Sequence, residues 1–82
     1  MAKRLKVLSG AEVLRILSIF GFKVVSQRGS HIKLRRIESG GERQTLTIPN
    51  HKELDRGTLG AIYRQASRYV PDAELRPLFY LD

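Results

Sequence analysis

The sequence predicts an α+β fold with elements in the order α-β-β-β-α and a short helical turn at the C-terminus. Two segments carry apolar residues at helical spacing, and the stretch between them alternates apolar and polar residues as strands do. The 82 residues leave room for one small domain, residues 1–82, with no linker or repeat. A domain of this size cannot enclose a large cofactor or a deep cleft between two lobes, which excludes Rossmann, kinase and barrel enzymes.

The first helix is expected over residues 10–20. Ser9 and Glu12 form a capping box, in which the serine oxygen accepts from the N–H at the third helical position and the glutamate reaches back to the cap. Apolar residues at three- and four-residue spacing form one stripe: Val13, Leu14, Leu17 and Phe20. Gly21 supplies the left-handed residue that ends many helices.

Three strands are expected next, over residues 22–28, 31–37 and 43–48. The first is rich in β-branched and aromatic residues, and the other two alternate apolar and polar residues. Gly29 and Ser30 allow a tight turn between the first two strands, and a Gly-Gly connection follows the second. The second and third strands therefore form a hairpin.

Alternation in the strand 31–37 separates two sets of side chains. Ile32 and Leu34 are expected to face the core, whereas His31, Lys33 and Arg35 share the opposite face. The histidine of the first half of the chain thus stands in line with two cations.

The second helix follows residue 55 and is capped by Asp55 or Thr58. Its buried face is formed by Leu59, Ile62, Tyr63 and Ala66. Residues 71–72 end it, and the terminal turn brings Leu78, Phe79 and Leu81 to an edge of the core. Two helices on one face of a three-stranded antiparallel sheet are the layout of double-stranded-RNA-binding domains, and they leave the other face of the sheet open to solvent or a partner.

Positive charge is concentrated in the first half of the chain. Residues 1–36 hold nine Lys or Arg and one acid, a net +8, whereas residues 37–82 hold six against seven acids, a net −1. Such a distribution attracts polyanions, and nucleic acid is the commonest polyanion for a small basic domain. The alternative is a solvated basic face without a dedicated ligand.

Several classes of site are excluded or disfavoured by composition. The chain has no cysteine, which removes disulfides, thiolate metal sites and cysteine nucleophiles and fits a reducing cytoplasm. With two histidines and no HExxH spacing, we expect no metal and no cofactor. No apolar run reaches the roughly 18 residues of a membrane span. We therefore expect a cytoplasmic protein that does not enter a membrane.

Acid-base cleavage of RNA is the chemistry that the remaining residues fit best. It needs a base for the 2′-hydroxyl proton, cations for the charge on the phosphate, and an acid for the leaving oxygen. His31 with Arg28, Lys33 and Arg35 supplies most of this set, because an imidazole ordinarily titrates at about pH 6.5. His51 is a candidate for the general acid.

Each of these residues also has a purely structural interpretation. A histidine at the start of a strand is commonly a rim residue, and a loop histidine such as His51 commonly bonds to backbone. Gly29 and Ser30 either simply make the turn or, being small, let a phosphate approach the backbone beside His31. The periodicity of the sequence leaves these alternatives open.

At these same residues the chain closely resembles the HicA family of toxins. The resemblance covers nearly the whole chain and is carried by Ser9-Gly10 with Glu12, Gly21-Phe22, Arg28-Gly29-Ser30-His31, Ile48-Pro49-Asn50-His51, and Arg56-Gly57-Thr58-Leu59 with Ile62 and Arg64-Gln65-Ala66. HicA proteins are mRNA interferases of toxin–antitoxin systems with a double-stranded-RNA-binding-like fold. The resemblance implies that His31, the histidine of Gly-Ser-His, is catalytic.

The resemblance also implies two partners: mRNA, and a HicB-like antitoxin that blocks the active site. We expect a metal-independent endoribonuclease with Arg28, Gly29, Ser30, Lys33 and Arg35 as RNA-binding residues. The rival interpretation is a module of the same fold that binds RNA and cuts nothing. The sequence leaves open a weak homo-oligomer, the cleavage preference and the antitoxin stoichiometry.

Overall fold

The computed structural model describes residues 4–81. The elements are β1 (Arg4–Leu5), α1 (Gly10–Ile19), β2 (Lys23–Arg28), β3 (His31–Ile37), β4 (Arg43–Pro49), α2 (Arg56–Ala66), α3 (Asp72–Phe79) and β5 (Tyr80–Leu81). The predicted α+β class and the α-β-β-β-α order are confirmed. The predicted domain also includes residues 1–3 and 82, which lie outside the described residues.

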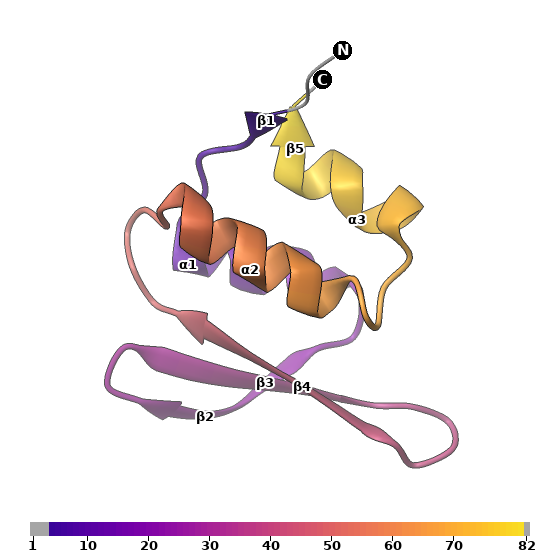
Figure 1. Cartoon of the computed structure of the whole chain (residues 1–82). Helices are drawn as coiled ribbons and strands as arrows, with labels where there is room; N and C mark the ends of the chain where they lie inside the picture. The colour runs from indigo at the N-terminus through magenta and orange to yellow at the C-terminus, as the bar shows by residue number, and fades with distance from the viewer. Residues whose placement is uncertain (1–3, 82) are drawn as a thin grey trace.

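The molecule is layered (Figure 1). β2, β3 and β4 form an antiparallel sheet with β3 at its centre, and α1 and α2 cover one face of it. β1 and β5 pair as a second sheet of two short strands, which lies with α3 at the opposite end of the molecule from the larger sheet. The face of the β2-β3-β4 sheet turned away from α1 and α2 is uncovered.

The core lies between that sheet and the helices. Its buried residues form one cluster: Leu8, Val13, Leu17, Phe22, Ile32, Leu34, Leu46, Ile48, Leu54, Leu59, Ile62, Tyr63, Ala66, Val70, Leu75 and Phe79. β3 and β4 contribute alternate residues to it, as predicted for Ile32 and Leu34. All six residues of β2 are exposed, because this edge strand lies beyond the cover of the helices.

The helix boundaries follow from local signals. The capping box at α1 is complete, with the Ser9 N–H donating to Glu12 Oε1 at 2.8 Å and the Glu12 N–H donating to Ser9 Oγ at 3.0 Å. Gly21 follows the helix with φ of 92°, a conformation that costs a glycine little. Asp55 caps α2, since its carboxylate accepts from the N–H of Thr58 at 3.0 Å.

The C-terminal segment is more substantial than the predicted turn. α3 has eight residues, and Leu75 and Phe79 on it are completely buried. The ring of Tyr63 in α2 packs edge-on against those of Phe79 and Tyr80, with 5.4 and 5.1 Å between ring centroids. The Tyr63 hydroxyl donates to the Asp72 carboxylate. α3 therefore completes the core on the side of α2 that faces away from the sheet.

Candidate nucleic-acid interface

The uncovered sheet face collects most of the predicted site residues. We call it the open face: Lys23, Ser26 and Arg28 of β2, His31, Lys33, Arg35 and Ile37 of β3, and Arg43, Thr45 and Thr47 of β4. Residues directly opposite each other on paired strands point to the same face. The pairs are Arg28 with His31, Ser26 with Lys33, Lys23 with Arg35, Lys33 with Thr47, Arg35 with Thr45, and Ile37 with Arg43.

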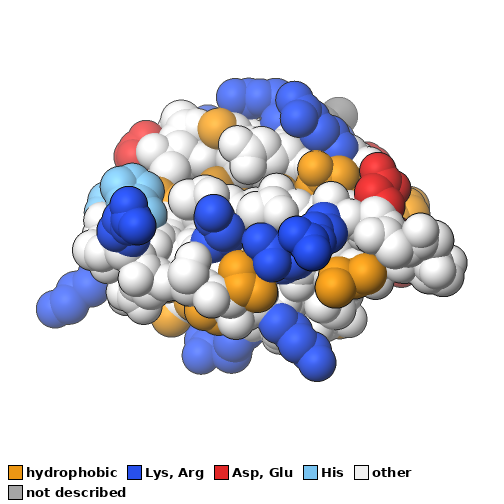
Figure 2. Space-filling view, turned by 90° about the horizontal axis from the view of Figure 1, so that it is seen from below, with side chains coloured by type: hydrophobic (Ala, Val, Ile, Leu, Met, Phe, Trp, Pro, Cys, Tyr) orange, Lys and Arg blue, Asp and Glu red, His pale blue; other side chains and the backbone are white. Residues whose placement is uncertain are grey.

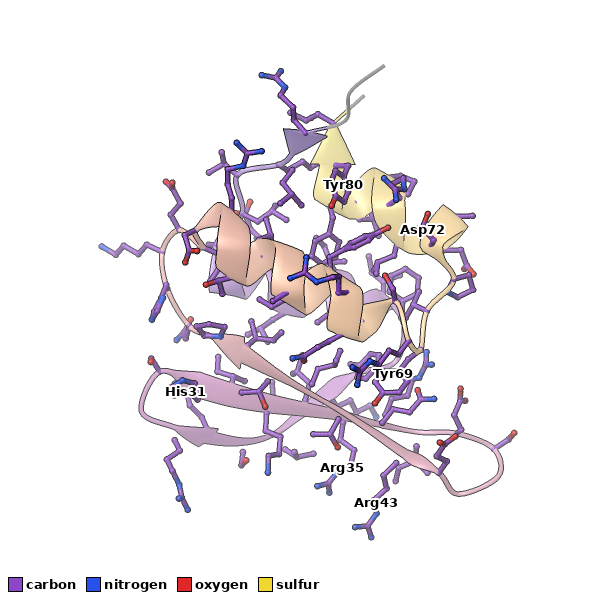
Figure 3. The ribbon with its side chains drawn as sticks, viewed as in Figure 1. His31, Arg35, Arg43, Tyr69, Asp72 and Tyr80 are labelled. Atoms are coloured by element: carbon purple, nitrogen blue, oxygen red, sulfur yellow. The ribbon has the colours of Figure 1, made fainter. Side chains whose placement is uncertain are left out.

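Cations extend across the open face from end to end. Figure 2 shows Lys and Arg side chains spread over it, histidine at one end, and Asp and Glu only toward its margins. In Figure 3, Arg35 and Arg43 project from the sheet away from the helices, and His31 lies at the end of the sheet. Among residues 4–81, no acid pairs with any of the open-face cations, which are Lys23, Arg28, Lys33, Arg35 and Arg43.

His31 lies in a shallow hollow of about 400 Å³ at one end of the open face, lined by Ser26, Gln27, Arg28, His31, Lys33 and Thr47. We call this the His31 hollow. It brings together three predicted residues, His31, Arg28 and Lys33. Arg35, the remaining predicted cation, is half-buried and lies two residues beyond Lys33 along β3, outside this hollow.

Gly29 and Ser30 form the turn that holds Arg28 opposite His31. Gly29 has φ of 60° whereas Ser30 has a negative φ, the pattern of a two-residue type II′ hairpin. No atom lies within 4 Å of the position that a Gly29 side chain would occupy, so the space above the turn is free. Both residues therefore form the turn, as their structural interpretation requires. Their contact with a phosphate stays a prediction.

The loop after β4 places His51 near the same end of the sheet. His31 pairs with Pro49, and the Asn50 N–H donates to the Ser30 carbonyl at 2.6 Å. The His51 carbonyl accepts from the Gly10 N–H at 2.8 Å, which fixes this loop on the start of α1. Its imidazole is exposed and, within the described chain, has no hydrogen-bond partner. Its predicted role as general acid stays a prediction.

Arg36 differs from its neighbour Arg35 although both belong to the basic first half. Its side chain turns toward the helices, where it donates to the carbonyls of Phe20 and Tyr69, each at 2.9 Å, and to Gln44 Oε1 at 2.8 Å. The charge of Arg36 is thus committed to internal contacts. The charge sum of residues 1–36 overstates the cations available to a polyanion.

Sequence reasoning missed Ser26 and Thr47, which line the His31 hollow. It also missed Lys23 and Arg43, two open-face cations toward the other end of the sheet. Alternation within β2 and β4 carries the signal for them, but it becomes informative only once the register to β3 is known. A bulge between Val24 and Ser26 shifts that register within β2.

The shifted pKa values belong to groups that fix the helices. The backbone N–H and hydroxyl of Ser9 lower the pKa of the Glu12 carboxyl, and the hydroxyl and N–H of Thr58 lower that of Asp55. Burial, and secondarily the hydrogen bond to Asp72, raises the pKa of Tyr63 to about 12. These groups stabilise α1, α2 and the contact with α3.

Two further features bear on the kind of protein. No three His, Asp or Glu side chains within residues 4–81 come together in a way that could hold a metal ion. No helix in the same range is long and apolar enough to cross a membrane.

Comparison with known proteins gives a family match. Residues 10–67 match the family model described as the HicA toxin of bacterial toxin–antitoxin systems, which is more than half of the chain. The matched range contains α1, the whole β2-β3-β4 sheet and α2, and therefore the complete open face. No curated protein and no solved structure matches the chain.

Proposed function

The chain belongs to the HicA toxin family and is thus a toxin of a toxin–antitoxin system, and we propose that it acts as a metal-independent mRNA endoribonuclease. The observation that carries this proposal is the His31 hollow, where, among residues 4–81, nothing hydrogen-bonds the His31 imidazole and no acid pairs with the neighbouring cations Arg28 and Lys33. Metal-independent cleavage of RNA through its 2′-hydroxyl needs this combination of proton acceptor and positive charge.

The proposed step is an intramolecular transesterification of the RNA backbone. The His31 imidazole takes the proton of a 2′-hydroxyl, and the 2′-oxygen attacks the adjacent phosphorus. The bond from phosphorus to the 5′-oxygen breaks, and that oxygen receives a proton, for which His51 is the candidate donor. Arg28 and Lys33 stabilise the charge on the phosphate oxygens. The products are a 2′,3′-cyclic phosphate and a 5′-hydroxyl end.

The test is cleavage of an unstructured mRNA by the wild type, His31→Ala and His51→Ala, with EDTA present throughout and circular dichroism to confirm folding. We expect His31→Ala to cleave roughly 10²- to 10⁴-fold more slowly while keeping its fold and most of its RNA affinity. Equal cleavage by wild type and His31→Ala contradicts the assignment of His31. Products with 5′-phosphate ends contradict the proposed chemistry, and binding without any cleavage favours a non-catalytic module.

We also propose that the antitoxin partner is a HicB-like protein, that it covers the His31 hollow, and that both act in the cytoplasm, where mRNA is available. An occupant of this hollow must neutralise Arg28 and Lys33, so an acidic surface is expected on the antitoxin. Purified antitoxin should displace a labelled RNA from the toxin, and displacement should be complete when there is one antitoxin binding site for each toxin. Formation of a ternary complex with undiminished RNA affinity would contradict this placement.

A further inference from the structure

A second hollow lies at the end of the sheet away from His31. Its volume is about 500 Å³, and it is lined by Gly21, Lys23, Val25, Arg35, Arg36 and Ile37. We call it the Lys23 hollow. None of its lining residues lines the His31 hollow, so the two are separate sites.

The Lys23 hollow combines cations with exposed apolar side chains. Lys23 and Arg35 are direct cross-strand partners, an arrangement of like charges that destabilises a sheet unless a ligand neutralises it. The Nε–H of Arg35 is buried and has no acceptor in the described part of the chain. Within residues 4–81, no acid or other acceptor therefore binds this guanidinium.

The apolar part of the lining is accessible as well. Val25 is 45% exposed and Ile37 is 65% exposed, although both are large hydrophobic residues. The bulge between Val24 and Ser26 inserts Val25 into the edge strand, where it lines the hollow beside Lys23. An apolar wall next to two unpaired cations suits a ligand with one flat, weakly polar part and one anionic part.

A nucleotide has this chemistry, with a base for the apolar wall and a phosphate for the cations. The positions of the two hollows decide which form of RNA they accept. Lys23 is paired with Arg35, which lies four residues from His31 along β3. At the rise of a strand, this separation is about 13 Å. Lys33 lies between His31 and Arg35 on the same face. One nucleotide cannot bridge that distance, whereas a short extended strand can follow it.

Base pairing distinguishes a single strand from a duplex here. In an A-form helix the bases are stacked inside and cannot lie against Val25 and Ile37, whereas an unpaired base is free to do so. Duplex RNA would instead need a basic surface that spans grooves. The open-face cations lie on three adjacent strands, β2, β3 and β4, which together are only about 10 Å across.

We propose that the Lys23 hollow is a second RNA subsite, which binds an unpaired nucleotide a few steps along the strand from the bond cleaved at His31. The RNA then lies extended along β3, with its phosphates on Lys33, Arg35 and Lys23. This inference rests on the proposed function for the position of the scissile bond. The proposal that RNA binds along β3 depends only on the residues of the open face, and not on cleavage at His31.

The test compares a dinucleotide, which reaches only the His31 hollow, with an unstructured octanucleotide, which reaches both. The variants are Lys23→Gln and Ile37→Ser. Matched controls on α1 are Arg15→Gln, which removes one exposed cation, and Ile19→Ser, since Ile19 is 68% exposed. We expect kcat/KM for the octanucleotide to fall about tenfold in each subsite variant and to be unchanged for the dinucleotide. The controls should match the wild type on both substrates.

Binding of a 2′-O-methyl octanucleotide, which cannot be cleaved through its 2′-oxygen, separates this inference from the proposed activity. If the wild type cleaves nothing but Lys23→Gln and Ile37→Ser bind this RNA about tenfold more weakly than both controls, the subsite stands and the enzyme assignment fails. Equal loss on the dinucleotide and octanucleotide overturns the subsite. Loss in Arg15→Gln equal to that in Lys23→Gln also overturns it. Failure of the wild type to bind the RNA overturns it too, and leaves an acidic protein as the ligand of the face.

Discussion

Two adjacent arginines on β3 allow a direct test of which face of the sheet stabilises the fold and which face binds RNA. Arg36 is the positioned member of the pair: three of its hydrogen bonds go to Phe20, Tyr69 and Gln44, and its Cζ lies 5.0 Å from the centre of the Phe22 ring. It thereby ties β3 to the end of α1 and to the segment after α2. Arg35 projects from the opposite face without an acid partner in residues 4–81.

The cost of Arg36→Met follows from the groups it leaves behind. Two backbone carbonyls and the Gln44 amide lose their donor, and an unsatisfied buried polar group costs about 1–3 kcal/mol. The Arg36 side chain is 18% exposed, so water replaces part of the loss and the low end of that range applies. With a small contribution from the lost stacking on Phe22, we expect about 3 kcal/mol. For a domain of this length, that is a large part of a total of about 4–12 kcal/mol.

The assay is urea unfolding of the wild type, Arg36→Met and Arg35→Met, together with binding of the 2′-O-methyl octanucleotide at a temperature where all three are folded. Arg36→Met should lose about 3 kcal/mol of unfolding free energy, equivalent to roughly 15 °C in Tm. Because Arg36 also lines the Lys23 hollow, its RNA affinity should fall, but less than that of Arg35→Met. Arg35→Met should raise the unfolding free energy by about 0.2–1 kcal/mol, since it removes the like-charge pair with Lys23, and should weaken RNA binding. The assignment of faces is refuted if the two variants exchange these effects, or if Arg36→Met loses less than about 1 kcal/mol.

Three further outcomes are expected. Gly10→Ala should lower the unfolding free energy by about 1–3 kcal/mol in urea titrations, because the new Cβ would overlap the Pro49 carbonyl oxygen; a neutral result would contradict this close packing. Lys23→Gln should raise the unfolding free energy by about 0.2–1 kcal/mol, since it relieves the like-charge pair with Arg35 while weakening RNA binding. The pKa of Tyr63 is raised to about 12, so its protonated hydroxyl stabilises the fold below about pH 10 and this contribution is lost as pH rises toward 12. Urea midpoints measured at pH 8, 10 and 11.5 should fall less steeply in Tyr63→Phe than in the wild type, and parallel curves would contradict it.

Much of the fold could be predicted because local signals agree with the final packing. The capping box, Gly21 and the alternation of β3 each act over a few residues and need no knowledge of the rest of the chain. β1 and β5 could not be predicted in this way. Each has two residues, and their pairing exists because α3 returns the chain to the side of Arg4.

The candidate site was predictable where a single strand carries it. His31, Lys33 and Arg35 follow from alternation within β3, and the same alternation places Arg36 on the helical side, a distinction that a sum of charges hides. Residues from the neighbouring strands depend on register. The bulge beside Val25 changes that register by one residue, and no local sequence signal fixes where such a bulge falls.

The destabilising effect of the open-face cations is offset by buried residues at the other end of the molecule. The like-charge pair of Lys23 with Arg35 destabilises the sheet, and a domain of this size has little core with which to offset it. The family match ends at residue 67, yet Val70, Leu75 and Phe79 beyond it are almost completely buried. They belong to the common core, Phe79 packs against the ring of Tyr63, and α3 lies on the side of α2 away from the sheet (Figure 1). The segment outside the family match therefore adds hydrophobic stability where it leaves the open face free for a polyanion.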